Sequence, residues 1–383
     1  MKIIIISYIY PNKLNPTLGI FVRQQSKYIA REGHEVHILT TGSSKDRKEE
    51  LIDKTTVHRL VNIDNKLPLK GFLFSLKCIK MIVSLNKKSN IDFVIQNFVG
   101  MGTILIGITV KLLKKRFIVV SHGTSWELPK KNFIKNLIIK MVLSVPDKIV
   151  CVSKKTEELL SFNTQRNKLV VINNGIDPEW LKPDIEGGKF RKKLGLGNKI
   201  ILLSVCSLVP KKGIDIIIKV LPRIIKEFPN LMYLVVGDGP EKEKLTNLTN
   251  NLCLEKNIKF LGTKMGSELA NYYNICDIFI LMSRDLKYTI ESFGIVYIEA
   301  SYFGKPVIAG VSGGTKDAVI DWQTGFLVKS DDTENIVKKL ALLIKNKKLR
   351  EKLGKAGRKR VIKSFFWKHN VRKLINMLNN LKN

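Results

Sequence analysis

The stretch of sequence that decides the fold runs from Lys199 to Gly237. It reads KIILLSVC at 199–206, SLVPKKGIDIIIKVLPRIIKEFPN at 207–230 and LMYLVVG at 231–237. Two short runs rich in Ile, Leu and Val thus flank a longer segment with helical spacing. Short apolar runs that alternate with helical patterns are typical of parallel strands covered by helices on both faces. This stretch therefore predicts an α/β protein.

The same alternation extends along the chain in both directions. Further predicted strands lie at 2–7, 35–40, 92–97, 116–121, 147–153, 168–173, 257–262, 277–283 and 306–310. A chain of 383 residues exceeds what one hydrophobic core usually organises. We therefore expect two doubly wound sheets, one in each half. Ligands bind such sheets outside the carboxyl ends of the strands, so the site is expected in a cleft between the two domains.

A segment without strand periodicity separates the two halves. It reads DPEWLKPDIEGGKFRKKLGLGN at 177–198 and is rich in Pro, Gly and charged residues. Pro and Gly clusters between periodic segments indicate loops. We expect the domain boundary near 178–198.

The charge of the chain indicates an anionic partner. Lys and Arg number 66 against 33 Asp and Glu, for a formal net charge of +33. Such an excess points to nucleic acid, an anionic membrane surface or phosphate-bearing small molecules. No nucleic-acid recognition motif is present, and the basic residues are spread over both halves, so we expect no nucleic-acid partner.

Three basic segments favour an anionic membrane surface. Residues 66–88 carry six lysines and no acid among Phe, Leu, Ile and Met, and residues 130–145 are similar. From Lys345 onward the chain has 14 basic residues and one acid, Glu351. Basic amphipathic helices lie on anionic leaflets, although a solvated lysine face explains the same pattern. We expect a protein at the inner face of the plasma membrane.

Cysteine usage and apolar runs indicate a cytoplasmic setting. The five cysteines are scattered singly without a CxxC pair, which argues against a disulfide framework or a zinc site. The apolar run at the N-terminus is too short for a secretory signal, and MGTILIGITVKLL at 101–113 is too short to cross a bilayer. We therefore expect a cytoplasmic, peripheral protein without a metal site.

The segment ESFGIVYIEASYFGKPVIAGVSGG at 291–314 carries the clearest chemical signal. Glu291 and Glu299 are eight residues apart, about 80° on a continuous helix, so we expect them to touch different parts of one ligand. A helix that starts near Phe293 would leave its first amides unpaired. Those of Phe293, Gly294 and Ile295 would then suit phosphate or sugar oxygens.

This segment resembles the E-x7-E motif of the retaining glycosyltransferases of family 4. Five other segments are similar to that family in the expected order: GHEVHILTT at 33–41, NNGID at 173–177, LVPKKGIDIII at 208–218, GDGPEKEKL at 237–245 and FLGTKMGSELANYYNICDIFILMS at 260–283. The resemblance implies the GT-B fold, with two facing Rossmann-like domains and a central cleft. We expect an acceptor-binding domain at 1–180, a nucleotide-sugar-binding domain at 181–365, and a basic helix at 366–383 that packs toward the N-terminal domain.

The resemblance also implies roles in the C-terminal half. Glu299 would bind the ribose hydroxyls of a nucleotide sugar, and Glu291 the hydroxyls of the transferred sugar. Lys212 would neutralise the departing diphosphate, which a flexible ammonium suits. The loop with Gly262 and Lys264 would lie against the base.

Other implied sites are Gly19, His122 and Ser207. His122 would contact the donor sugar, and the Gly19 loop would meet the diphosphate and the acceptor. Trp126 and Glu127 would line the acceptor side. Ser207 stands in the phosphate-binding loop, where many members of the family carry Arg, and this departure puts full phosphate neutralisation in doubt.

The implied reaction is a metal-independent transfer of a sugar from a UDP- or GDP-linked donor to an acceptor hydroxyl, with retention at the anomeric carbon. The charge favours a lipid-linked, polysaccharide or glycan-precursor acceptor. A GT-B isomerase (epimerase) that acts on nucleotide sugars is one alternative, and a basic membrane- or nucleic-acid-binding protein without catalysis is another. A nicotinamide dehydrogenase does not fit, because no GxGxxG motif occurs.

Overall fold

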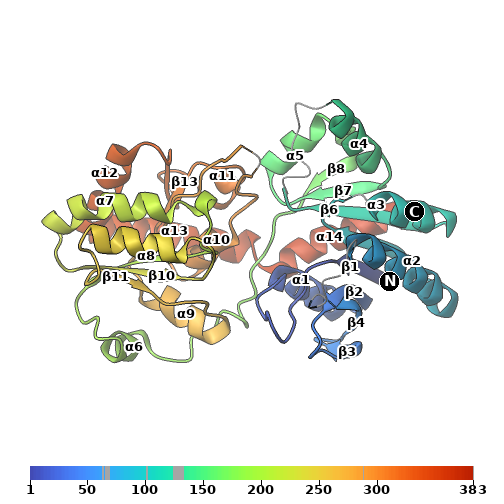
Figure 1. The fold of residues 1–383 in the computed structure, drawn as a ribbon, viewed down its shortest axis with the longest axis horizontal. Coiled ribbons are helices and arrows are strands. Elements are labelled where there is room, and N and C mark those ends of the chain that lie inside the picture. Colours follow the sequence, from blue (N-terminus) through green and yellow to red (C-terminus); the bar gives the residue numbers. More distant parts are fainter. Residues whose placement is uncertain (63, 65–69, 101, 124–132, 288, 383) are drawn as a thin grey trace. The chain divides into compact units, whose positions relative to one another are not determined.

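The computed structural model describes residues 1–62, 64, 70–100, 102–123, 133–287 and 289–382. The chain forms two compact units (Figure 1): unit 1 is Met1–Gly175 with Trp367–Asn383, and unit 2 is Ile176–Phe366. It therefore leaves unit 1 after Gly175 and returns after Phe366. The boundaries that we predicted lie at 180/181 and 365/366.

Unit 1 is built on an eight-stranded sheet with the order β3-β4-β2-β1-β5-β6-β7-β8. All neighbouring strands are parallel except β3 and β4, which are antiparallel. Its elements are β1 (Lys2–Ser7), α1 (Ile20–Arg31), β2 (Glu35–Gly42), β3 (Glu49–Ile52), β4 (Thr55–Asn62), α2 (Lys70–Ser89), β5 (Phe93–Asn97), α3 (Gly102–Leu112), β6 (Arg116–Ser121), α4 (Phe133–Ser144), β7 (Lys148–Cys151), α5 (Lys154–Ser161), β8 (Leu169–Val171) and α14 (Trp367–Lys382).

The apolar runs of the sequence form the centre of this sheet. Residues 3–6 of β1 and 117–120 of β6 are almost completely buried. Strands covered by helices on both faces have no polar side, and this is why they read as continuous apolar runs rather than as alternating patterns.

The last helix of the chain, α14, belongs to unit 1. In Figure 1 this red helix lies among the blue and cyan elements of that unit. It packs against α1, where Trp367 Nε1 donates a hydrogen bond of 2.9 Å to Gln24 Oε1. Trp367 and Leu378, near the two ends of α14, are both buried.

Unit 2 is built on a six-stranded sheet with the order β11-β10-β9-β12-β13-β14, and all of its strands are parallel. Its elements are α6 (Gly187–Lys193), β9 (Ile200–Val205), α7 (Ile214–Glu227), β10 (Leu231–Val236), α8 (Lys242–Asn251), β11 (Ile258–Phe260), α9 (Gly266–Ile275), β12 (Ile278–Leu281), α10 (Ile295–Tyr302), β13 (Val307–Gly310), α11 (Thr315–Ala318), β14 (Gly325–Val328), α12 (Thr333–Lys345) and α13 (Lys347–Ser364).

The segment that we expected to link the halves is part of unit 2. Its helix α6 packs against α9. Arg191 of α6 donates to Ile275 O and, at 2.7 Å, to Asp277 Oδ2. Buried packing and these hydrogen bonds fix the segment, and composition alone does not reveal them.

All eleven predicted strands are present, and the described residues contain three further strands that were not predicted. Strands β3 and β4 form a hairpin at the sheet edge, where Asp53 and Lys54 adopt positive φ angles of 51° and 64°. Strand β14 has only four residues. An edge strand such as β3 and a very short strand such as β14 lack the long apolar run that marks a buried strand. Strand β4, between β3 and β2, mixes buried and half-buried residues and also lacks that run.

Candidate functional site

A nearly buried ion pair lies at the carboxyl edge of the unit 2 sheet. Lys212 ends the short 3₁₀ turn (Pro210–Lys212) that leads from β9 into α7, and Glu291 lies between β12 and α10. The Lys212 ammonium donates a hydrogen bond to Glu291 Oε2. The two side chains are only 15% and 10% exposed. The structure thus brings these two predicted residues into direct contact.

Two loops hold Glu291 in place. Ser283, two residues after the end of β12, donates to Glu291 Oε2 at 3.1 Å. The loop after β13 fixes the backbone of Glu291: the Glu291 amide donates to Ser312 Oγ at 3.0 Å, and the Gly314 amide donates to Glu291 O at 2.7 Å. The carboxylate is therefore positioned by contacts on both its side chain and its main chain.

The charges of this pair are stable at neutral pH. Burial alone raises the pKa of Glu291, but the Lys212 ammonium more than offsets this, so that the pKa lies below its ordinary value. Burial alone lowers the pKa of Lys212, but the negative charge of Glu291 raises it by more, so that the pKa lies above its ordinary value. Burial and the Lys212 charge lower the pKa of Lys211. Two lysines thus face one carboxylate, which leaves a positive excess that suits an anionic ligand.

Burial also affects the thiol of the neighbouring Cys206. Burial raises the pKa of its thiol to about 12. The reactive form of cysteine is the thiolate. The thiol is therefore neutral at physiological pH.

The N-terminus of α10 is the second feature of the site. The helix begins at Ile295 rather than near Phe293, because Gly294 adopts a left-handed conformation with φ 85°. None of the described residues provides an acceptor for the amides of Phe293, Gly294 and Ile295. Unpaired amides at a helix N-terminus bind anions. Within the described part of the chain, the three amides that we predicted as donors are unpaired, although the helix begins two residues later than expected.

Glu299 lies one turn into α10, half-buried against aromatic residues. Tyr273 donates a hydrogen bond of 2.7 Å to Glu299 Oε2, and the Tyr273 ring stacks on Phe303. Burial raises the pKa of Glu299 to about 7, although the hydrogen bond from Tyr273 opposes this shift. Because Glu291 precedes the helix, the two glutamates do not share one helix, and the angle of about 80° that we expected does not apply.

The other predicted residues of unit 2 lie in loops at the same edge of the sheet. Ser207 follows β9 and is exposed. Gly262 follows β11 with φ 67°, and its carbonyl accepts from the Gly237 amide at 2.9 Å. The side chain of Lys264 pairs with Glu268 of α9 at 2.6 Å. Loops after parallel strands meet at one edge, which explains why residues distant in sequence gather here.

His122 and Gly19 lie at the carboxyl edge of the unit 1 sheet. His122 follows β6, and its Nε2 lies 2.9 Å from Asn97 Oδ1 at the end of β5. The rings of Phe21 and Phe98 are each 4.7 Å from the imidazole. Burial lowers the pKa of His122 to about 3, so the ring is neutral. With Nε2 donating to the Asn97 oxygen, Nδ1 is left as an acceptor.

Gly19 begins α1 in a left-handed conformation with φ 67°. A Cβ at this position would lie 2.6 Å from Ile9 O, so the loop after β1 requires glycine. Trp126 and Glu127 lie outside the described residues.

Sequence reasoning missed the residues that orient the predicted ones. Ser283, Ser312 and Tyr273 contact the two glutamates or the backbone beside them, and Asn97 contacts His122. Ser312 lies inside the conspicuous 291–314 segment, which was a usable signal. Tyr273 and Ser283 lie inside the 260–283 segment and Asn97 ends the predicted strand 92–97, but these local patterns do not indicate which side chains they contact.

Among the described residues, no helix is both long enough and apolar enough to span a bilayer. No three side chains of His, Cys, Asp or Glu among them lie together in a way that could hold a metal ion.

Comparisons with known proteins identify the family. Residues 18–180 match the family described as Glycosyltransferase Family 4, and residues 188–360 match Glycosyl transferases group 1. An uncharacterized glycosyltransferase of Haemophilus influenzae is 30% identical over 329 residues, which cover 84% of both chains. The chain belongs to glycosyltransferase family 4. It is therefore a sugar-transferring enzyme, as the resemblance implied.

A second relative matches a shorter part of this chain. The GDP-mannose-dependent alpha-(1-6)-phosphatidylinositol monomannoside mannosyltransferase of Mycolicibacterium smegmatis is 30% identical over 207 residues. The match covers 53% of this chain and 54% of that protein, so the chain spans about half the length of this relative.

Solved structures confirm the predicted GT-B fold. Sucrose-phosphate synthase from Thermosynechococcus elongatus superposes with a TM-score of 0.82 at 22% identity, over 100% of this chain and 99% of that chain. Anabaena Alr3699/HepE, solved in complex with UDP, gives a TM-score of 0.79 at 20% identity, over 99% and 100% of the two chains.

Proposed function

We propose that this family 4 glycosyltransferase moves a sugar from a UDP- or GDP-linked donor to a hydroxyl group of a lipid-linked, polysaccharide or glycan-precursor acceptor, with retention at the anomeric carbon. The observation that carries the proposal is the buried Lys212–Glu291 pair in the same unit as the unpaired amides of the α10 N-terminus. A positive excess and free amide donors match a diphosphate, and a fixed carboxylate matches sugar hydroxyls.

In this proposal the protein itself stabilises the leaving group. The bond between the anomeric carbon and the diphosphate oxygen breaks, and negative charge grows on the diphosphate. Lys212 and the amides of Phe293, Gly294 and Ile295 stabilise that charge, in place of a metal ion. Ser207 contributes no cation, and Lys211 is the second positive group near the pair.

Retention follows from attack on the same face of the sugar. The acceptor hydroxyl forms the new bond to the anomeric carbon, and its proton passes to the departing phosphate oxygen. Glu291 binds sugar hydroxyls and stays ionised throughout. Glu299 binds the ribose hydroxyls, the loop with Gly262 and Lys264 lies against the base, and Gly19 and His122 contact the donor. These roles remain predictions.

Both nucleotides have support among related proteins. The mycobacterial relative is named as GDP-mannose-dependent, whereas Anabaena Alr3699/HepE was solved with UDP. The acceptor has support from the same relative, whose name states a phosphatidylinositol mannoside.

The association with an anionic membrane rests on α2. The helix carries five lysines and no acid, and Phe72 and Leu76 expose apolar side chains one turn apart on it. Sedimentation with vesicles tests this part of the proposal. We expect binding to vesicles with anionic lipid and loss of that binding in 0.5 M salt, in which surface charges are largely screened.

A thermal-shift panel with UDP, GDP, ADP, CDP and dTDP tests the donor site. A ligand at about 100 times its dissociation constant adds roughly 2.7 kcal/mol to the stability of the folded state. One diphosphate should raise the melting temperature of the native enzyme but not that of Glu299→Ala. Glu255→Ala is the matched control, because Glu255 is an exposed acid of the same unit. No shift with any nucleotide would contradict the proposal.

A further inference from the structure

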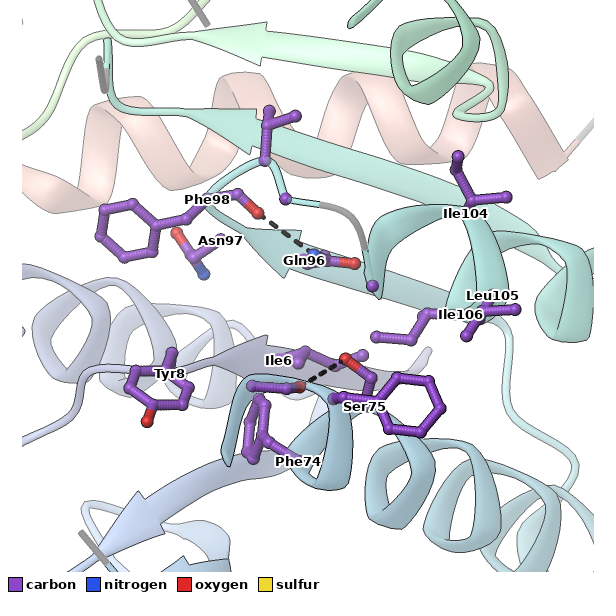
Figure 2. A pocket seen from close by; sticks show the side chains of 15 residues that line it. Ile6, Tyr8, Phe74, Ser75, Gln96, Asn97, Phe98, Ile104, Leu105 and Ile106 are labelled. Carbon is purple, nitrogen blue, oxygen red and sulfur yellow. Dashed lines mark hydrogen bonds between the residues drawn. The ribbon is translucent and has the colours of Figure 1, made fainter. Parts of the chain in front are cut away.

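Unit 1 contains an apolar pocket that has no role in the proposed reaction as described above. The pocket has a volume of about 800 Å³ and lies among the ends of β1 and β5 and the first turns of α2 and α3. Figure 2 shows Phe74 and Ser75 on the α2 side and Ile104, Leu105 and Ile106 on the α3 side, with Gln96 between them. A volume of this size is typical of sites that bury most of a small ligand.

The pocket is continuous with the surroundings of His122. Asn97 and Phe98 line the pocket. Asn97 Oδ1 is also the hydrogen-bond partner of His122, and the Phe98 ring packs on the imidazole. An occupant would therefore have one end beside the side chains that hold His122. The pocket also lies at the carboxyl ends of two parallel strands, the edge at which α/β sheets bind ligands.

The lining of the pocket is mainly apolar, and polar Asn97 lies at the end beside His122. Among the described residues, the buried Gln96 Oε1 and Asn97 Nδ2 atoms have no hydrogen-bond partner. Toward the helices the lining is apolar, with Phe74 and Ile106 buried. Buried polar atoms without partners are unfavourable, so a polar group of a ligand beside Asn97 would relieve this penalty. The lining thus matches a molecule with one polar end and one apolar end.

The rim of the pocket points to a lipid as the source of that molecule. Phe72 and Leu105 line the pocket and are 53% and 40% exposed. On α3 the apolar exposure continues along one face through Ile108 and Leu112. The neighbouring α2 carries five lysines and no acid, which complements an anionic lipid surface. A water-soluble acceptor would need neither the apolar rim nor the apolar interior.

We propose that this pocket binds a single apolar chain of a lipid acceptor and so places the polar end of that lipid beside Asn97 and His122. The inference rests on the proposed function, because it assigns the acceptor class of the same enzyme. It makes the length of the apolar chain a determinant of acceptor binding.

A series of alkyl phosphates tests the proposal by calorimetry. The probes are n-butyl, n-hexyl and n-octyl phosphate, each below its micelle concentration. The dissociation constant should fall about fourfold for each added methylene, because each one leaves water for an apolar site. Equal affinity for butyl and octyl phosphate would overturn the proposal.

Gly71 is a lining residue with space for a larger side chain, so a substitution there tests the pocket. Gly71 lines the pocket in the first turn of α2, and a Cβ placed there meets no atom of the described residues within 4 Å. Gly71→Leu should weaken octyl phosphate binding at least tenfold, and Gly100→Leu, at a second open glycine of the lining, should do the same. Gly188→Leu is the matched control, at the second residue of helix α6 in unit 2.

Nucleotide binding separates the two proposals. The Gly71→Leu variant should keep the thermal shift of the native enzyme with its nucleotide, because the predicted nucleotide residues belong to unit 2. If nucleotides bind but chain length has no effect, or if Gly71→Leu binds octyl phosphate normally, the pocket proposal alone fails. If chain length matters but no nucleotide binds, the donor proposal fails and the lipid-chain pocket stands.

Discussion

Replacement of Glu299 by glutamine should remove the part of the pH dependence of nucleotide binding that comes from Glu299. Burial raises the pKa of Glu299 to about 7, far above its ordinary value of 4.5. In the proposed site the ionised carboxylate accepts hydrogen bonds from the ribose hydroxyls. Since this group titrates near neutral pH, nucleotide affinity should depend on pH in the physiological range.

The size of the effect follows from the ionised fraction. With a pKa of about 7, the fraction of Glu299 that is ionised falls from about nine tenths at pH 8 to about one tenth at pH 6. Nucleotide affinity should therefore drop about tenfold over these two units. The Lys212–Glu291 pair adds nothing to this change, because the pKa of Glu291 is lowered and that of Lys212 is raised.

Titration calorimetry at pH 6, 7 and 8 measures this dependence on the native enzyme and on Glu299→Gln. The nucleotide phosphates titrate in the same range, but equally for both proteins, so the ratio of the two affinities isolates Glu299. Parallel pH profiles for the native enzyme and the variant would refute the reasoning.

Stability provides a second readout of the same pKa. Between pH 4.5 and about 7 the folded state keeps a proton on Glu299 that the unfolded chain has released. The contribution of Glu299 to stability therefore falls as the pH rises through this window. Glu299→Gln should be more stable than the native enzyme at pH 8, by up to about 3 kcal/mol, and by much less at pH 5. Urea unfolding at both pH values measures the difference.

Three further outcomes follow from contacts in the structure. Lys212→Met leaves the Glu291 carboxylate buried without its ammonium partner and should lower the free energy of unfolding by about 3 kcal/mol at pH 8, whereas the double variant with Glu291→Gln should recover most of this loss in urea titrations. Gly313→Ala places a Cβ 2.0 Å from Glu291 O at a φ of 46°, so it should displace Glu291 and reduce kcat at least about tenfold in a transfer assay. Gly304→Ala is the control, because Gly304 also has a positive φ but lies in open space, and it should keep full activity. Trp367→Ala should destabilise unit 1 by roughly 3 to 5 kcal/mol in circular-dichroism melts, and an unchanged melt would mean that α14 does not support that unit.

The sequence predicted the fold well where strands are fully buried. Central strands such as β1 and β6 read as unbroken apolar runs, because helices cover both of their faces. Strand β3 alternates between exposed and half-buried residues at the sheet edge, and such a pattern resembles a loop. The start of α10 was placed two residues too early, because a glycine in the left-handed conformation delays the helix.

The candidate site was predictable only in part, because the sequence shows local motifs but not the contacts between distant elements. Glu291, Glu299 and Lys212 occur in conspicuous local motifs. Ser283 follows β12 and Tyr273 lies in α9, and each contacts a glutamate only because the fold brings these separate elements together. Their roles depend on strand order, which a linear pattern does not contain.

The place of α14 in unit 1 has a consequence for biosynthesis. Ribosomes make the first 175 residues early, but Trp367, Leu374 and Leu378, which are buried in the finished protein, emerge only after the whole of unit 2. The surface of α1 that α14 covers is therefore exposed throughout translation of the intervening sequence. Unit 1 begins synthesis first and is completed last, and an isolated version of it would require residues 367–383 to be grafted directly after Gly175.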